Sequence, residues 1–420
     1  MEKLLRTIRS LIPSVLFKVM QPPYHYLLAG IGALWYRFPS RKLYVVGVTG
    51  TKGKTSTTEL VAALLEEAGF RVAFANTNRL KIADCIEEND TERSMLGRTL
   101  LQQFLRRAVD AKCAYAVLEM TSEGAKQFRH AFIDLDALIF TNLSPEHIES
   151  HGSYEKYLEA KLRLARALER GRARQHTIVA NRGDAEATKF LSVRVGTRLS
   201  YDIADAQPYT TAPEGGEMTW CGKSIRLRLP GEFNIMNALA AATFTKSRGV
   251  SVETIQSALE KFAGISGRME RISEGQNFTV IVDYAHTADS LDHAYSVYAG
   301  IKKICILGGT GGGRDIAKRK VMGEIADKHC EYIILTTEDP YDEDPEDIAA
   351  DVAKGIHNRP HEFIRDRREA IQKAFRMAEK DSVVFITGKG ASNYIMGSEG
   401  VRIPWNDADV AREELTKRSL

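Results

Sequence analysis

The segment VGVTGTKGKTSTTEL, residues 46–60, decides the fold. It begins in a short apolar run typical of a strand, turns through glycine residues, and continues into a segment with helical character. Such a loop presents backbone N–H groups to phosphate oxygens, while Lys54 meets the outer phosphates and Thr55 offers a hydroxyl to Mg²⁺. The strict pattern has glycine where Val48 stands, so the match is partial. The residues that we predict to bind a nucleotide are Thr49, Gly50, Thr51, Lys52, Gly53, Lys54, Thr55 and Ser56.

From residue 42 onward, short β-rich runs alternate with amphipathic helical stretches, a pattern that predicts parallel sheets covered by helices. The clearest predicted strands form two series: 43–48, 114–120, 137–143 and 177–181, then 278–284, 303–309, 331–337 and 382–388. Residues 197–230 predict a small β-rich insert. We predict an α/β protein in which a P-loop central ATPase domain with a mostly parallel sheet precedes a Rossmann-like C-terminal domain. The predicted division is a segment 1–42, a central domain 43–267 and a C-terminal domain 268–420.

The composition is that of an ordinary globular protein. The 420 residues are 44% hydrophobic and 27% charged, with a formal net charge of +3, so the bulk charge predicts no nucleic-acid partner. The five cysteines are scattered and form no C-x-x-C pair, which indicates neither a zinc ribbon nor a disulfide framework. A reducing cytoplasm fits this cysteine usage best.

The first 42 residues form a basic, amphipathic segment. They carry seven lysine and arginine residues against the single acid Glu2, and apolar residues lie between these charges. The uncharged stretch after Lys18 contains two prolines, which makes it short for a membrane span and favours an interfacial helix. Two interpretations stay open: the segment packs on the next domain, or it contacts a membrane surface.

A second group of polar residues lies in TNLSPEHIESHGSYEKYLEAKLRL, residues 141–164. The end of a predicted strand supplies Asn142, a loop supplies His147, and a predicted helix carries Lys161. Taken singly, His147 reads as an ordinary loop histidine and Lys161 as a solvated helix charge. The nucleotide loop by itself does not distinguish kinases, GTPases, ATPases and ligases, so the combination carries the argument.

With these motifs in order, the sequence resembles the Mur ligase family, the ATP-dependent amino-acid ligases of cell-wall precursor synthesis. The resemblance covers residues 43–417 and looks closest to the members that add the third amino acid, a diamino acid, to a UDP-linked muramyl dipeptide. The motifs that carry it are TGTKGKTST (49–57), LEMTSEG (118–124), TNLSPEH (141–147), HGSYEKYLEAK (151–161), GEFNIMNALAA (231–241), GRME (267–270), VDYAHTADSL (282–291), GGRDIAKR (312–319), EDPYDEDP (338–345) and GKG (388–390).

The resemblance implies that ATP activates an acceptor carboxylate as an acyl phosphate, which the incoming amine then attacks. It implies two Mg²⁺ sites, in which Thr55 and Glu119 hold one ion and His147 holds the second. Lys161 matches a lysine that is carbamylated in these enzymes, and the carbamate turns a cation into a carboxylate-like ligand. Lys54, Lys161 and His147 are therefore the expected catalytic residues of the central domain.

Further residues are assigned by the same resemblance. Asn234 and Asn237 match the adenine-side asparagine region of the family. Arg268 matches an arginine that reaches the phosphates when the domains close, and it is the fourth expected catalytic residue. Asp283 and His286 match positions where the C-terminal domain approaches the nucleotide, with Asp283 the expected ribose contact.

The amino-acid site departs from the pattern of the members that use meso-diaminopimelate. Their D-N-P-R motif, whose arginine grips a distal carboxylate, corresponds here to residues 338–341 and ends in Tyr341, which cannot form a bidentate clamp. The G-K-G-H-E motif corresponds to residues 388–392 and ends in Ser392. We therefore expect a different amine, such as lysine or another diamino acid. The residues expected to bind it are Asp339, Pro340, Tyr341, Gly388 and Ser392.

The acceptor side is open at this stage. A UDP-sugar-binding domain normally precedes the loop in these ligases, and the residues before Val46 are too few for such an α/β unit. We expect a small-molecule or lipid-linked peptide acceptor of the muramyl-peptide type, with the enzyme in the cytoplasm or at the inner face of the membrane. Residues 1–42 are the expected membrane contact, and a partner protein is a second way to supply the missing surface.

Two alternative functions are kept. Folylpolyglutamate synthetases also lack the UDP-binding domain, although their D-G-A-H-N-P motif disagrees with Tyr284 and Thr287. A protein of another class, a nucleotide-binding scaffold without catalysis, would not need a lysine that can be carbamylated. The presence of Lys161 therefore favours a ligase.

Overall fold

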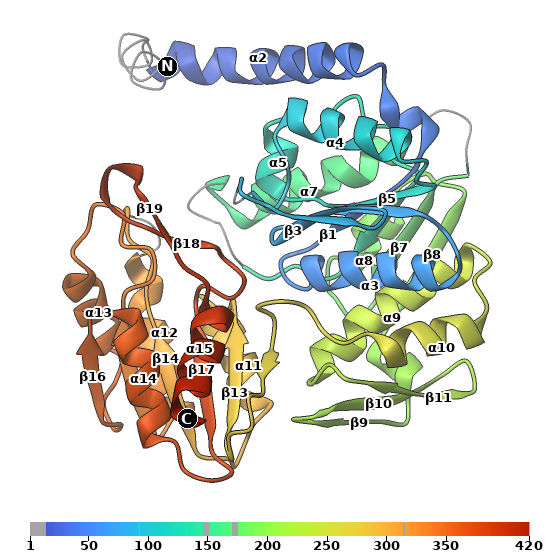
Figure 1. Cartoon of the computed structure of the whole chain (residues 1–420). Coiled ribbons are helices and arrows are strands. Elements are labelled where there is room, and N and C mark those ends of the chain that lie inside the picture. Colours follow the sequence, from blue (N-terminus) through green and yellow to red (C-terminus); the bar gives the residue numbers. More distant parts are fainter. Residues whose placement is uncertain (1–13, 92, 146–150, 170–174, 314–315, 420) are drawn as a thin grey trace. The chain divides into compact units, whose positions relative to one another are not determined.

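The computed structural model describes residues 14–419 except 92, 146–150, 170–174 and 314–315 (Figure 1). The chain divides into two compact units, each described by itself. The first contains the described chain up to Gln207, together with Thr219–Lys223 and Met236–Lys261. The second contains Pro208–Met218, Ser224–Ile235 and Phe262–Leu420.

The first unit is built on an eight-stranded sheet in the order β4-β3-β2-β5-β1-β6-β7-β8. Strands β2, β5, β1, β6, β7 and β8 are paired in parallel, and β3 and β4 are added in antiparallel fashion at one edge. The strands are β1 (Tyr44–Thr49), β2 (Val72–Ala75), β3 (Arg79–Ile82), β4 (Cys85–Glu88), β5 (Tyr115–Glu119), β6 (Ala137–Phe140), β7 (Thr177–Asn181) and β8 (Thr197–Tyr201). The helices are α2 (Ser14–Trp35), α3 (Lys54–Glu67), α4 (Arg98–Asp110), α5 (Ser122–Lys126), α7 (Tyr154–Glu169), α8 (Ala187–Leu191), α9 (Glu232–Ser247) and α10 (Val252–Lys261).

The central strands β1, β5 and β6 are apolar along nearly their whole length, as expected for a parallel sheet covered on both faces. Polar residues lie where these strands end, and several of them, such as Thr51, Glu119 and Thr141, are buried. The carboxyl ends of β1, β5 and β6 meet at one edge of the sheet, so the chain can gather a site from segments far apart in sequence.

The second unit contains a six-stranded sheet in the order β12-β13-β17-β14-β15-β16, parallel except for β12. Its strands are β12 (Glu270–Ile272), β13 (Thr279–Asp283), β14 (Lys303–Leu307), β15 (Tyr332–Thr336), β16 (His361–Ile364) and β17 (Val383–Thr387), with a separate hairpin of β18 (Tyr394–Met396) and β19 (Arg402–Pro404). Its helices are α11 (Ala288–Ser296), α12 (Ile316–His329), α13 (Pro345–Ala353), α14 (Arg367–Met377) and α15 (Asp407–Ser419).

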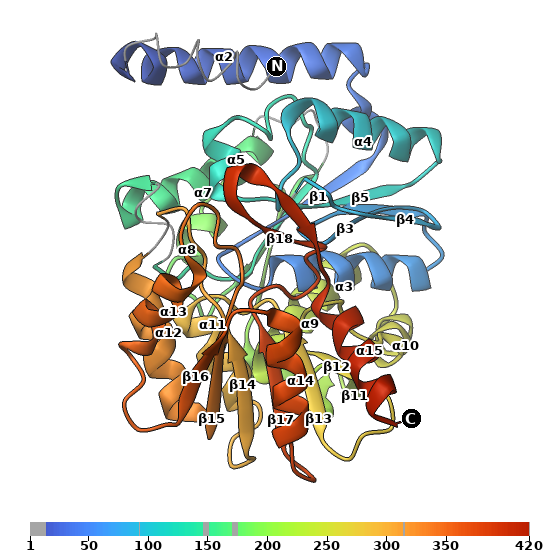
Figure 2. The ribbon, with the colours of Figure 1, turned by 60° about the vertical axis from the view of Figure 1, so that its left-hand side comes forward.

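Alternate residues of this second sheet face two different helical layers. Ile281, Cys305 and Phe385 pack with residues of α11, α12 and α13. Ile304 and Ile306 and their neighbours pack with α14 and α15, which lie over the other face (Figure 2). The expected α/β fold with two sheets is therefore confirmed. The predicted β-rich insert is also present, as an antiparallel sheet of β9 (Tyr209–Ala212), β10 (Gly215–Trp220) and β11 (Lys223–Leu227).

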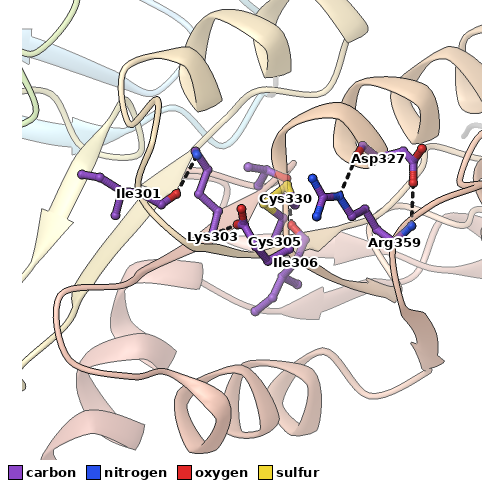
Figure 3. The surroundings of a disulfide bond; sticks show 9 residues. Ile301, Lys303, Cys305, Ile306, Asp327, Cys330 and Arg359 are labelled. Atoms are coloured by element: carbon purple, nitrogen blue, oxygen red, sulfur yellow. Dashed lines mark hydrogen bonds between the residues drawn. A yellow bond between two sulfur atoms is a disulfide. The ribbon is translucent and has the colours of Figure 1, made fainter.

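One feature of the second unit was not predicted. Cys305 on β14 and Cys330 just after α12 form a disulfide, with their Cα atoms 6.1 Å apart (Figure 3). The side chain of Cys305 points into the helical layer that contains α12, and the chain returns from α12 beside β14 to begin β15. The expectation of no disulfide framework missed this pair because it arises from sheet topology rather than from a spacing motif.

Candidate active site

The loop between β1 and α3 depends on two glycines. Gly50 has φ +156°, and a Cβ at this position would lie 1.9 Å from Oγ1 of Thr141. Gly53 has φ +76°, and a Cβ there would lie 2.3 Å from Oδ1 of Asn237. A side chain at either position would therefore collide with its neighbour, and Gly53 also adopts a left-handed conformation that disfavours other residues. The predicted strand–loop–helix is thus present, with the first turn of α3 starting at Lys54.

The end of β6 holds this loop in place. Asn142 accepts from the Thr51 N–H through its carbonyl oxygen (2.8 Å) and from the Lys52 N–H through Oδ1 (2.9 Å). The hydroxyl of Thr141 donates to the Lys52 carbonyl oxygen (2.7 Å). These contacts join segments about 90 residues apart in sequence, so the shape of the loop is fixed before any nucleotide binds.

Glu119, the last residue of β5, lies against the first turn of α3. Its Oε2 accepts from the hydroxyl of Thr55 (2.9 Å) and from the N–H and hydroxyl of Thr77 (3.0 Å each). Nζ of Lys54 lies 4.0 Å from Oε1 of Glu119 and donates to the Thr51 carbonyl oxygen (2.8 Å). The carboxylate is 3% exposed, so these partners compensate for its burial. Thr77 is part of this site although no motif of the sequence predicts it.

Lys161 on α7 is also brought to the loop. Its side chain is buried, its Nζ donates to the Gly50 carbonyl oxygen (2.6 Å), and the ring of Tyr157 lies 4.8 Å away. Tyr157 in turn hydrogen-bonds through its hydroxyl to the side chain of Thr51 (3.0 Å). The prediction that Lys161 belongs beside the phosphate loop, rather than on a solvated helix face, agrees with this placement.

The other predicted residues of the first unit are placed as follows. Asn237 on α9 lies beside the loop, where its Oδ1 accepts from the hydroxyl of Thr57 (3.3 Å). Thr49 and Ser56 are buried at the two ends of the loop. His147 lies outside the described residues. His151, four residues further on, is buried with its Nε2 3.1 Å from the hydroxyl of Ser122, a contact that the sequence analysis did not single out.

The described oxygen ligands near the loop are suited to Mg²⁺ that is bound together with a nucleotide, and they are too few for a metal ion held by the protein alone. Among the residues that the structure describes, no group of three or more His, Cys, Asp or Glu side chains could hold a metal ion. The Thr55 hydroxyl and the Glu119 carboxylate are oxygen ligands 2.9 Å apart. Mg²⁺ typically takes one or two such protein ligands and completes its shell with water and substrate phosphates. The pair therefore fits Mg²⁺ bound together with a nucleotide.

A separate cluster lies in the second unit. Arg268 stacks on Tyr284, with its Cζ 4.5 Å from the ring centroid, and its buried Nε has no hydrogen-bond partner. The ring of His286 meets the same tyrosine edge-on, 4.8 Å between centroids. Gly267 packs so tightly that a Cβ would lie 2.0 Å from the Ala391 N. The GRME, VDYAHT and GKG motifs therefore meet in one place.

Asp283 holds the backbone of this cluster. Its carboxylate accepts from the Met269 N–H (2.6 Å) and the Ala285 N–H (2.7 Å). Burial raises the pKa of Asp283, while nearby Arg268 and these two N–H groups act in the opposite direction. Both carboxylate oxygens are engaged with the protein, so Asp283 is placed here as a structural support, and its expected ribose contact stays a prediction. Asn234 is buried and donates to the Pro230 carbonyl oxygen (2.9 Å).

The predicted amino-acid residues surround a buried acid that was not among them. Glu338 follows β15, is 3% exposed, and accepts through Oε1 from the hydroxyl of Thr310 (3.1 Å), whereas its buried Oε2 has no hydrogen-bond partner. A Cβ on Gly388 would lie 2.5 Å from this oxygen, so the glycine leaves it space. Burial raises the pKa of Glu338, and neighbouring Asp339 raises it further. Glu338 is the first residue of the EDPY motif, so the sequence places it near the predicted site. That its Oε2 has no hydrogen-bond partner follows from the structure alone.

Three nearby cations, Arg367, Lys389 and Lys318, lower the pKa of Glu338 against the effect of burial. Arg367 is itself paired with Asp407 (2.7 Å). Nζ of Lys389 lies 2.7 Å from Oδ1 of Asp339, which also accepts from the Met396 N–H. Buried Arg319 pairs with Glu343 (2.8 Å) and Asp351 (3.0 Å). The guanidinium of Arg367 donates to Asp407 and to two backbone carbonyl oxygens, and that of Arg319 donates to two acids, so both arginine forks near Glu338 are already engaged.

The remaining residues of this group shape the loop. Pro340 is buried, and its carbonyl oxygen would lie 2.0 Å from a Cβ on Gly311. Tyr341 adopts φ +53°, an uncommon conformation for a bulky residue, and its N–H donates to the Met396 carbonyl oxygen (3.1 Å). Ser392 caps the GKG turn through its N–H to the Lys389 carbonyl oxygen (2.9 Å).

Comparisons with known proteins match both units. Residues 48–245 match the Mur ligase middle domain, and residues 267–390 match the glutamate ligase domain of Mur ligases. A UDP-N-acetylmuramyl-tripeptide synthetase from Roseiflexus sp. (strain RS-1) is 36% identical over 417 residues, covering 93% of this chain and 82% of the relative.

Solved structures agree with this match. A UDP-N-acetylmuramoyl-L-alanyl-D-glutamate–2,6-diaminopimelate ligase superposes with a TM-score of 0.64 at 28% identity, covering 94% of this chain and 84% of that one. A folylpolyglutamate synthase from Mycobacterium tuberculosis superposes with a TM-score of 0.70 at 16% identity, covering 86% and 92%, which shows likeness of fold alone.

Proposed function

Because the chain belongs to the Mur ligase family, whose members are ATP-dependent ligases that form amide bonds, we propose that it joins an amino acid to a muramyl-peptide-type carboxylate through an acyl phosphate. The arrangement that carries this proposal is the set of Lys54, Thr55, Glu119 and Lys161 around one loop of the first unit. A binding scaffold needs a phosphate loop, but it has no use for a buried lysine beside it.

In this proposal the residues of the loop position the terminal phosphate of ATP. The loop amides and Nζ of Lys54 neutralise phosphate charge, and a water-poor, preorganised setting makes such contacts effective in phosphoryl transfer. Thr55 and Glu119 would hold Mg²⁺, which when bound neutralises charge on the phosphate oxygens. His147 would hold a second Mg²⁺. The acceptor carboxylate then attacks the γ-phosphorus and ADP leaves, after which the amine displaces inorganic phosphate.

Lys161 has a proposed role that its contacts allow. Its unprotonated amine adds to CO₂, forming a carbamate and releasing one proton. The carbamate nitrogen keeps one N–H, which still reaches the Gly50 carbonyl oxygen to which Nζ donates at 2.6 Å. The new carboxylate-like group would then face the phosphates as a metal ligand, while Tyr157 fixes the side chain.

In the second unit, we assign amino-acid binding to the surroundings of Glu338. A cationic group of the incoming amino acid would give Oε2 of Glu338 the partner that it lacks. Lysine and other diamino acids fit this acid, and meso-diaminopimelate, with its second carboxylate, is disfavoured by Tyr341 and Ser392. Asp339, Pro340 and Gly388 would shape the site. Asn234, Asn237, Asp283 and His286 are proposed to contact the nucleoside part of ATP, and Arg268 the phosphates.

The acceptor is the least defined part of the proposal. A UDP-linked or lipid-linked muramyl peptide both present the required carboxylate, and a partner protein that recognises the carrier stays a proposal, as does a cytoplasmic location at the inner face of the membrane. A folylpolyglutamate-type acceptor is the second candidate, and Tyr284 and Thr287 disfavour it.

The decisive experiment measures phosphate release from ATP with candidate acceptors crossed against candidate amino acids. We expect release only when both are present, with a diamino acid preferred to meso-diaminopimelate. Release that is fastest with meso-diaminopimelate would refute the amino-acid assignment, and release that never depends on an amine would refute the ligase mechanism. Lys161→Ala should be nearly inactive, and ¹³C-labelled bicarbonate should give a carbamate signal in the wild-type protein that this variant lacks.

A further inference from the structure

Helix α2 presents a row of large apolar side chains to solvent. The residues recur at helical spacing along one side, and each is at least half exposed: Met20, Tyr24, Leu27, Ile31, Leu34 and Trp35. Leu27 is 63% exposed, Leu34 69% and Trp35 79%. Single exposed apolar residues are common, but a continuous row of them marks an interaction surface. Both family matches begin after this helix, so the ligase domains do not account for it.

The opposite side of α2 carries small residues, with Tyr26 beside them packed against the rings of Phe128 and Phe132. Ala29 and Ala33 are buried, a Cβ on Gly30 would lie 3.3 Å from the ring of Phe132, and one on Gly32 would lie 3.4 Å from the Cα of Thr99. The helix therefore packs closely on α4 and its surroundings through small residues (Figure 1). A helix that only covered the protein would direct its large apolar residues inward. In α2 Tyr26 packs inward, but most of the large apolar residues lie on the outer side, which is therefore suited to a second contact.

The charges around α2 restrict what that contact can be. The sequence has no Asp or Glu between Glu2 and Glu59. Arg37, Arg41 and Lys42, which follow the helix, are exposed, and Lys18 lies in its first turns. The described residues contain no helix that is long and apolar enough to cross a membrane. Basic residues beside an exposed row of leucine, isoleucine, tyrosine and tryptophan are typical of helices that lie in the plane of an anionic membrane surface.

We propose that the outer side of α2 binds the surface of an anionic lipid bilayer, with Leu27, Ile31, Leu34 and Trp35 entering the boundary between headgroups and acyl chains. A second copy of the chain is a poorer occupant, because pairing two such helices would bring two basic flanks together. In each flank Asp134 already pairs with Arg41 (3.6 Å), and Arg37 and Lys42 add further positive charge. The proposal concerns binding only. It stands or falls independently of the ligase mechanism, although it would place a lipid-linked acceptor near the enzyme.

The test uses the full chain and two kinds of vesicle, phosphatidylcholine alone and phosphatidylcholine mixed with phosphatidylglycerol. We expect co-sedimentation with the mixed vesicles that weakens as salt is added, and a blue shift of tryptophan fluorescence that Trp35→Phe removes. The double variant Leu27→Glu/Leu34→Glu should lose roughly ten-fold or more of this partitioning. A matched control, Val401→Glu/Ile403→Glu, changes two exposed apolar residues of the second unit and should bind normally.

Phosphate release on a soluble acceptor should be unchanged in the α2 variant, which shows that the variant is folded. Equal binding of the wild type and the α2 variant would overturn the proposal, as would binding that is independent of anionic lipid. Self-association of the wild type that the α2 variant abolishes, with no vesicle binding, would assign the surface to a second copy instead and would also overturn it.

Discussion

Two buried glutamates, one in each unit, occupy comparable places and differ in how they are satisfied. Glu119 ends β5 and Glu338 follows β15, both at the carboxyl ends of parallel strands, and both are 3% exposed. Glu119 is surrounded by two hydroxyls, an N–H and a lysine, whereas Oε2 of Glu338 has no partner. A carboxylate whose hydrogen-bond donors are all present keeps a fixed position, which suits a metal ligand. A buried carboxylate oxygen without a donor is suited to bind a cationic group of a substrate.

The largest expected effect follows from removing the charge of Glu119. Glu119→Gln keeps an acceptor for Thr55 and Thr77 but removes the negative charge that would face Mg²⁺. Turnover should fall by on the order of 1,000-fold, with a higher Mg²⁺ requirement, because positioned charge is the main contribution to phosphoryl transfer. Steady-state kinetics with a Mg²⁺ titration measure this. Glu66→Gln, which affects a lysine pair on the same unit, is the control. Turnover within a few-fold of wild type would make Glu119 a purely structural residue.

The second unit also contains a covalent link between β14 and the end of α12. The Cys305–Cys330 disulfide closes a loop with a sequence separation of 25. Chain-entropy arguments give about 3.5 kcal/mol of stabilisation for a loop of this length. Cys305→Ala/Cys330→Ala should lower the unfolding free energy of the second unit by up to about this amount, read from hydrogen exchange of β14 and β15 amides with and without reductant.

The control for the disulfide is Cys113, a buried free thiol of the first unit. Cys113→Ala should leave the exchange of β14 and β15 unchanged. Two free thiols at Cys305 and Cys330 by mass spectrometry under non-reducing conditions, with exchange insensitive to reductant, would show that the link does not form in solution.

Glu338→Gln tests whether the carboxylate whose Oε2 lacks a hydrogen-bond partner binds the amino acid. The loss of a charge-assisted contact should raise KM for a diamino acid roughly ten- to a hundred-fold while leaving KM for ATP unchanged. Asp342→Asn, an exposed acid on the same loop, is the control and should change little. KM for an amino acid without a second amine should be the same in wild type and variant. If KM for the diamino acid does not respond to the substitution, Glu338 does not bind the substrate.

The same substitution makes a prediction for stability. Burial raises the pKa of Glu338 above its ordinary value of 4.5, so the folded state keeps this proton to higher pH than the unfolded chain does. Stability therefore falls as pH rises from the unfolded pKa through the folded pKa, and stays lowered above it. Glu338→Gln should be the more stable protein in neutral solution without substrate, and this advantage should shrink on acidification. A pH series of thermal unfolding measures it, and a constant difference at all pH values would contradict it.

The sequence predicted Glu119 as a site residue but not Glu338, and the difference has a physical reason. The P-loop is a local pattern, since glycine conformation and the order strand–loop–helix lie within a few residues, and Glu119 and Lys161 followed from resemblance. Thr77, which completes the bonding of Glu119, lies 42 residues away on no motif. Whether Glu338 has a partner depends on Thr310, Gly388 and the packing between them. Periodicity predicts that a residue is buried, but not which of its atoms lack a partner.

The disulfide and the orientation of α2 also depend on contacts between distant segments, which a local sequence pattern does not predict. Cys305 and Cys330 meet because β14 and β15 are neighbours in the sheet, which no spacing of two cysteines indicates. The sequence predicted an amphipathic helix near the start of the chain, but it could not tell which side would pack. The structure places the small residues inward and the large ones outward. His147 lies outside the described residues, so its metal role stays a prediction.

The smallest effect is expected at Thr77, which supplies two of the hydrogen-bond donors to Glu119. Thr77 gives Oε2 both a hydroxyl and an N–H, so Thr77→Val removes the hydroxyl bond to Glu119 and keeps the N–H bond. It also removes the contact between this hydroxyl and Ser94 (2.8 Å). Turnover should fall about ten-fold, the low end for one hydrogen bond to a charged acceptor because the Thr77 N–H remains, and KM for ATP should hardly change. Thr91→Val, which removes a hydroxyl bond to Asn89 in the same unit, is the matched control. A loss as large as that of Glu119→Gln would mean that the orientation of the carboxylate, and not its charge, is what the first unit preserves.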